Sequence, residues 1–137
     1  MYKRLITFLF VGVLCLSFVA CKKDSEIDST MADIHTATDE IVAKINASPT
    51  VTGVDDAQKY WDSKKESLKK KWDGIKDARG FQVSDDTKKK MTDSYTKDYM
   101  AIKGLEIKHM GVSIRDAAFK SKLEKLVKEW EDTFSAK

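Results

Sequence analysis

The sequence has only two cysteines, and both lie close to its N-terminus. Cys15 and Cys21 are the only thiols among the 137 residues, so the 116 residues after Cys21 contain none. A domain built from those residues can have no disulfide scaffold, no thiolate metal site and no cysteine nucleophile. Such a domain must be held together by packing alone.

Motifs that catalysis requires are also missing. The chain has no nucleophile elbow, no glycine-rich phosphate loop and no zincin motif. Its many carboxylates stand at the expected helix starts and on polar faces, where capping and pairing with lysines explain them. We therefore predict a protein that is not an enzyme.

The chain also lacks a large excess of one charge. After Cys21 it has 23 basic and 22 acidic side chains, because Lys3 and Arg4 come before it. A nucleic-acid partner would need clustered positive charge, so none is predicted. The lysine blocks at 64–65, 69–71 and 88–90 are interpreted as solvated helix faces, with contact to anionic lipid headgroups as the alternative.

The longest apolar run lies at the N-terminus. Leu5 to Ala20 is 16 residues long, preceded by Lys3 and Arg4 and interrupted only by single small or polar residues. A membrane span needs roughly 20 apolar residues, whereas this length is typical of a secretory signal peptide. The run ends in Phe18-Val19-Ala20-Cys21, which resembles the lipobox of bacterial lipoproteins, although leucine is usual where Phe18 stands.

The resemblance implies that Cys21 is acylated, with palmitate among its chains, and becomes the N-terminus. Each buried methylene contributes about 0.8 kcal/mol, so several chains anchor stably to a bilayer. Lys22 stands where an aspartate retains lipoproteins in the inner membrane in the best-known sorting system, which favours the outer membrane. An ordinary signal peptide with an incidental cysteine and an uncleaved anchor remain alternatives.

The expected domain organisation is a signal at 1–21, a polar tether at 22–26 and a helical domain at 27–137. The first helix is expected to begin near Ser25 and to break around Pro49. The second is expected to start at a capping box, Thr52 to Asp55, and to end at Gly80.

Ser84 is expected to cap a third helix, and Ser113 to Asp116 is interpreted as a capping box for the last one. Apolar residues at alternating spacings of four and three predict the buried stripes of these helices. The predicted core positions are Ile27, Met31, Ile34, Thr38, Ile41 and Ile45; Val54, Ala57, Trp61, Leu68, Trp72 and Ile75; Met91, Tyr95, Tyr99, Ile102 and Leu105, with His109 or Met110 at the end; Phe119, Leu123, Leu126, Trp130 and Phe134.

This pattern predicts an all-α fold. Short loops cannot reach the far end of a long helix, so sequence neighbours must run antiparallel, as in an up-down-up-down four-helix bundle. A three-helix bundle is the alternative if the third and fourth helices merge through Gly111.

Helical bundles can hold metals or haem, but no cofactor is predicted here. Glu106 and His109 form one Glu-x-x-His element, whereas di-iron bundles need two such elements and two further glutamates. His35 or His109 with Met31 could supply haem ligands, but methionine on a helical stripe is usually core filler.

Four residues are candidate partner contacts. Tyr60 and Trp61 are adjacent on a helix and cannot both point inward, and a 78–83 loop could present Arg79 and Phe81. The predicted function is a membrane-anchored envelope lipoprotein, a non-enzymatic helical bundle that binds another envelope component. A surface-displayed lipoprotein binding an extracellular ligand is the alternative, followed by a metal- or haem-carrying periplasmic bundle.

Overall fold

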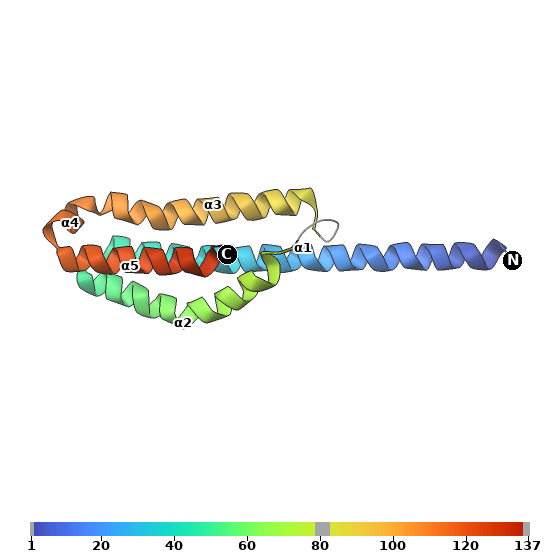
Figure 1. Ribbon diagram of the computed structural model, residues 1–137, viewed down its shortest axis with the longest axis horizontal. Helices are drawn as coiled ribbons and strands as arrows, with labels where there is room; N and C mark the ends of the chain where they lie inside the picture. The colour runs from blue at the N-terminus through green and yellow to red at the C-terminus, as the bar shows by residue number, and fades with distance from the viewer. Residues whose placement is uncertain (1, 79–82, 136–137) are drawn as a thin grey trace.

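The computed structural model describes the backbone of residues 2–78 and 83–135, and side chains within these ranges from Lys23 onward. The described residues form helices and no strand (Figure 1). The helices are α1 (Tyr2–Ala47), α2 (Val51–Ile75), α3 (Asp85–Lys108), α4 (Met110–Arg115) and α5 (Ala117–Phe134). The predicted all-α bundle of four long helices is confirmed. The three-helix alternative is wrong, because the short α4 separates α3 from α5.

Successive long helices alternate in direction along the bundle (Figure 1). Laterally, however, α1 packs against α2 and α3, and α5 packs against the same two helices. Consecutive helices α2 and α3 therefore lie on a diagonal of the bundle, and so do α1 and α5. As a result α1 and α3 are parallel neighbours: His35 meets Asp98 and Asn46 meets His109, both at a separation of 63 residues.

The predicted stripes of α1, α2 and α5 form the core, and every predicted position on them is at most 6% exposed. The one polar position, Thr38, is explained by Trp130. The Trp130 indole Nε1 donates a hydrogen bond to Thr38 Oγ1 at 3.1 Å, and Thr38 Oγ1 donates to the Ile34 carbonyl at 2.9 Å. Both polar groups of this buried pair are satisfied.

The stripe of α3 is only partly buried. Ile102 and Leu105 lie in the core, whereas Met91, Tyr95 and Tyr99 are half-buried at its edge. The Tyr95 ring stacks on Trp72 at a centroid distance of 5.6 Å and so bridges the α2–α3 diagonal. Of the four long helices, α3 therefore has the weakest apolar attachment.

The predicted helix starts are right for α3 and wrong for α2 and α5. Ser84 caps α3 by accepting a hydrogen bond from the Thr87 amide. The cap of α2 is Thr50, two residues before the predicted one, and accepts from the Gly53 amide at 3.3 Å. The cap of α5 is Asp116, which accepts from the amides of Ala118 and Phe119, while Ser113 lies inside α4.

The predicted polar tether at 22–26 is instead part of α1. Lys23 Nζ donates to the Gly74 carbonyl at 2.8 Å near the end of α2, and Asp24 Oδ1 accepts from the Ser84 amide at 3.3 Å. These polar contacts hold the segment against the bundle. The predicted stop at Gly80 and the side chain of Cys21 lie outside what the structure describes.

Candidate functional site

The C-terminal half of α3 and the short α4 carry all the large apolar side chains that are well exposed in the described part of the chain. Met100 is 65% exposed, Ile107 73%, Met110 55% and Ile114 79%. We call these four residues the α3–α4 face. Clustered exposed apolar residues on a soluble domain are typical of interaction surfaces, whereas single ones need no explanation.

Helix geometry explains why this face is separate from the core. Met100 and Ile107 are seven residues apart, almost two full turns, so they point the same way. Ile102 and Leu105 lie on the opposite side of α3, where they are buried. The C-terminal half of α3 is therefore apolar on two sides, and only the side with Ile102 and Leu105 is buried in the core.

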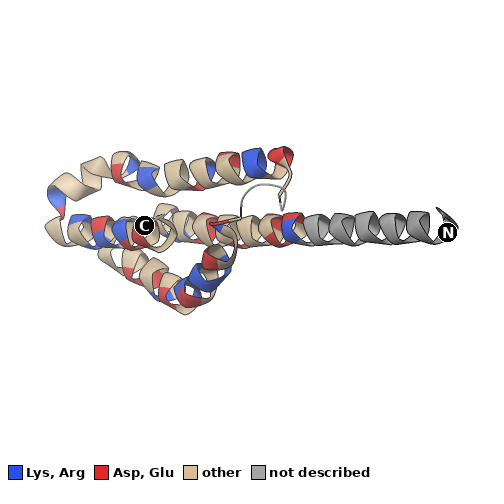
Figure 2. Ribbon diagram, turned by 45° about the vertical axis from the view of Figure 1, so that its right-hand side comes forward, with Lys and Arg blue, Asp and Glu red and all other residues tan. Residues whose placement is uncertain are grey.

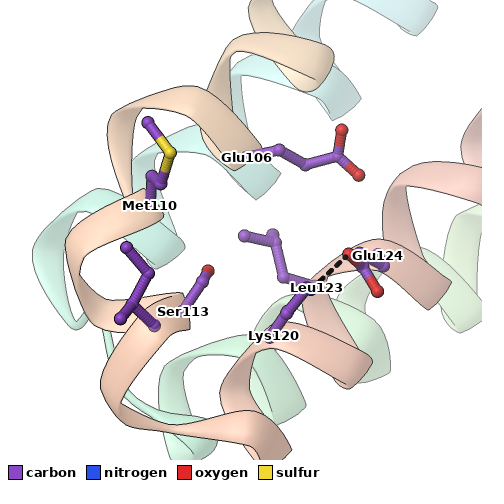
Figure 3. A pocket seen from close by; sticks show the side chains of 7 residues that line it. Glu106, Met110, Ser113, Lys120, Leu123 and Glu124 are labelled. Carbon is purple, nitrogen blue, oxygen red and sulfur yellow. Dashed lines mark ion pairs between the residues drawn. The ribbon is translucent and has the colours of Figure 1, made fainter.

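A pocket of about 280 Å³ opens beside this face, between the end of α3, α4 and the first turns of α5. Figure 3 shows the Leu123 side chain in the middle of the pocket, with Met110 and Glu106 beside it on the α3–α4 side. Lys120 and Glu124 pair with each other at 3.8 Å on the α5 side. The pocket offers an apolar interior and a charged rim, which suits one apolar side chain of a ligand.

The predicted contact Trp61 is corrected by the structure. Its ring is fully buried and meets the Phe134 ring edge-on at 5.9 Å, so it belongs to the core. Tyr60 is the outward member of the pair and lies half-buried between the ammonium groups of Lys44 and Lys64, at 5.7 and 5.9 Å from its ring centroid. Tyr60 thus remains a candidate contact, although its ring already has partners within the chain.

The other two predicted contacts, Arg79 and Phe81, lie outside the described residues. Sequence reasoning did not single out the α3–α4 face. It considered only Met110, as an alternative to His109 at the end of the buried stripe, and the structure buries His109 instead. The signal of the face was the helical spacing of Met100, Ile107 and Ile114, which runs beside the predicted core stripe.

His35 joins α1 to α3 through a buried carboxylate. Its Nδ1 lies 2.6 Å from Asp98 Oδ1, and its Nε2 lies 3.2 Å from Asp39 on its own helix. Burial raises the pKa of the Asp98 carboxyl, and the hydrogen bond to His35 partly offsets this rise. The arrangement is a hydrogen-bonded link between two helices.

His109 makes a second link between the same helices. Its Nε2 lies 2.9 Å from Asn46 Oδ1, and burial, with the nearby charge of Lys108, lowers the pKa of its imidazole. Glu106, the other half of the Glu-x-x-His element, pairs with Lys103 at 3.3 Å. Among the residues that the structure describes, no group of three or more His, Cys, Asp or Glu side chains is arranged so that it could hold a metal ion.

The lysine blocks are largely neutralised by carboxylates of their own helices. Lys69 pairs with Asp73 at 2.7 Å, and Lys88 and Lys90 pair with Asp85 and Asp86 at 2.9 and 2.7 Å. Figure 2 shows acidic and basic positions interspersed along α2 and α3. This pairing supports their interpretation as solvated faces.

Comparison with known proteins gives no relative. The chain matches no model of a known protein family, and neither a curated protein nor a solved structure matches it. In the part of the sequence described by the structure, no helix has the length and apolarity needed to cross a membrane.

Proposed function

We propose that this protein is a lipoprotein of the cell envelope, anchored through acylated Cys21, and that its bundle binds another envelope component without catalysing a reaction. The lipobox-like end of the N-terminal apolar run supports the anchor. The α3–α4 face is the single observation that supports binding, because it is an apolar surface that folding leaves unused.

The position of the face suits a tethered binding domain. His109, between α3 and α4, contacts Asn46 near the C-terminal end of α1, whereas Cys21 precedes Lys23 near the opposite end of the bundle. The 25 residues of α1 from Lys23 to Ala47 rise about 36 Å at 1.5 Å per residue. An anchor at Cys21 would thus leave the face far enough from the bilayer to meet a partner.

The anchor is tested by lipid labelling and fractionation of three forms in the native source. Wild-type protein and a Cys15→Ala control should incorporate labelled palmitate and partition with membranes. Cys21→Ala should lose the label, because it removes the thiol that is proposed to be acylated. Cys15→Ala is the matched control, because it removes a nearby thiol without changing the lipobox. Equal labelling of Cys21→Ala would rule out this anchor.

Binding is tested by photo-crosslinking in the same cells. A photoreactive residue at position 107 should capture an envelope component, whereas one at the exposed polar position 59 on α2 should not. Equal capture from both positions would contradict a specific role of the face. Protease treatment of intact cells then separates a partner inside the envelope from an extracellular ligand.

A further inference from the structure

The exposed side of α3 and α4 carries a regular seam. Beyond the break at His109 it contains Gly111 and Ile114 of α4, and within α3 it consists of Met100, Gly104 and Ile107 at spacings of four and three. This is the periodicity of a helix face that packs on another helix. A Cβ atom added at Gly104 or Gly111 would meet nothing within 4 Å, so both glycines lie on open surface and let a partner backbone approach closely.

The seam spans 15 residues and bends at one point. His109, the residue between α3 and α4, has φ −103° and ψ 17°, outside the helical region, and the chain turns there toward α5. Ile114, beyond the bend, lines the 280 Å³ pocket together with Met110. A helix lying on α3 would therefore place its end over this pocket.

The charges beside the seam are predominantly basic. Lys97, Lys108 and Arg115 are exposed and form no ion pair with a carboxylate in the described part of the chain. Lys103, by contrast, is neutralised by Glu106 at 3.3 Å and Glu131 at 3.0 Å. The uncompensated charge along the seam is thus positive.

Taken together, spacing and charge define the ligand. We infer that the seam binds an amphipathic helix of a partner protein, with apolar residues every three to four positions and acidic residues flanking them. The inference deepens the proposed function and rests on it for the identity of the site. A second copy of this chain fits poorly, because pairing two seams would bring Lys108 and Arg115 of both copies together.

A membrane surface fits the seam less well than a helix. Faces that lie in a bilayer interface carry bulky Trp, Phe and Leu residues, whereas this seam carries methionine, isoleucine and two glycines. Glycines at the contact positions reduce the apolar area that a bilayer could take up. They increase how closely a helix can pack.

The test is a selection of helical peptides against the full-length protein held in phosphatidylcholine nanodiscs. The peptide library has heptads in which the apolar seam and the flanking positions are randomised. We expect enriched peptides to carry Asp or Glu at the flanks. Ile107→Ser should weaken their binding about tenfold or more, as expected for removal of one buried aliphatic side chain from an interface.

Two further variants test whether the charges beside the seam determine which peptides bind. Lys108→Glu with Arg115→Glu should reverse the preference toward peptides with basic flanks, and Lys59→Ser, at an exposed site on α2, should change nothing. Circular dichroism of each variant confirms that the bundle is intact.

Other outcomes overturn the inference. These are enrichment of peptides without acidic flanks, no enrichment over the Ile107→Ser variant, flotation of the nanodiscs with phosphatidylglycerol vesicles in place of peptide binding, or self-association abolished by Ile107→Ser. Because the lipid anchor is measured separately by the Cys21→Ala and Cys15→Ala pair, a failed selection overturns the partner's chemistry and leaves the anchor proposal intact.

Discussion

Trp130 is one of the largest fully buried side chains of the core, so its replacement tests the packing directly. Its ring is fully buried, meets the Phe134 ring edge-on at 4.9 Å and stacks near Tyr95 at 5.9 Å. Trp130→Ala should lower the free energy of unfolding by about 3 to 5 kcal/mol, because the cavity cannot be filled from four packed helices. Domains of this size are stable by roughly 5 to 15 kcal/mol, so the variant should be close to unfolding.

The hydrogen bond to Thr38 can be measured apart from the ring. Trp130 is the only one of the three tryptophans whose buried indole nitrogen has a hydrogen-bond acceptor, because those of Trp61 and Trp72 have none. Trp130→Phe should therefore cost about 1 kcal/mol more than the matched Trp61→Phe. Thr38→Val, which leaves the Trp130 nitrogen buried without an acceptor, should cost about 1 to 3 kcal/mol.

The assay is urea unfolding of the chain from Lys22 onward, followed by circular dichroism. The Thr38→Val and Trp130→Phe pair should show a coupling of at least about 0.5 kcal/mol in a double-mutant cycle. A loss below about 1 kcal/mol for Trp130→Ala would mean that the ring does not lie in the core. Additive effects of the pair would refute the hydrogen bond.

Four further predictions concern backbone packing, pH and local stability. Gly53→Ala should be strongly destabilising, because a Cβ there would lie 1.9 Å from the Ser48 carbonyl oxygen. Gly104 has open space around it, so Gly104→Ala should stabilise the bundle by up to about 1 kcal/mol in the same unfolding assay. The lowered pKa of His109 means that the unfolded chain binds its proton more readily, so stability should fall as the pH drops through and below about 6.5, and His109→Gln should flatten this fall. The raised pKa of Asp98 acts in the opposite direction, so stability should decline as the pH rises above the ordinary pKa of an aspartate carboxyl. An equal decline in Asp98→Asn would contradict this. Native-state hydrogen exchange should be faster in α3 than in α1, and equal protection would contradict its weaker packing.

The sequence predicts the buried stripes of α1, α2 and α5 well, because each of these helices has one apolar stripe where it packs in the bundle. Residues such as Ile34, Trp61 and Leu126 recur every three or four positions and have no apolar competitor on the opposite side. The N-cap residues of α2 and α5 were harder to predict, because several Ser, Thr and Asp residues near the start of each helix could act as the N-cap. At α2 the chain folds back so that the Ser48 carbonyl lies over Gly53, a contact that local sequence does not reveal.

The candidate site could not be predicted for a related reason. In the second half of α3, Ile102 and Leu105 form one helical stripe, and Met100 and Ile107 form another. The sequence assigned Ile102 and Leu105 to the core correctly, but whether the second stripe is also covered depends on how α3 docks against α1 and α5. The pairing of His35 with Asp98 could not be predicted either. The two residues are 63 positions apart in the sequence, and they meet only because of the register between the parallel helices α1 and α3.

The diagonal placement of α2 and α3 connects the fold to the proposed binding. Because α3 packs laterally on α1 and α5 and meets α2 mainly through the Trp72–Tyr95 stack, it contributes few fully buried apolar residues. Its attachment relies instead on polar links at His35 and His109. A ligand that binds only the native form stabilises the protein by mass action. A helix bound to the seam would therefore stabilise the long helix that the core holds least firmly, which links occupancy of the face to the order of α3.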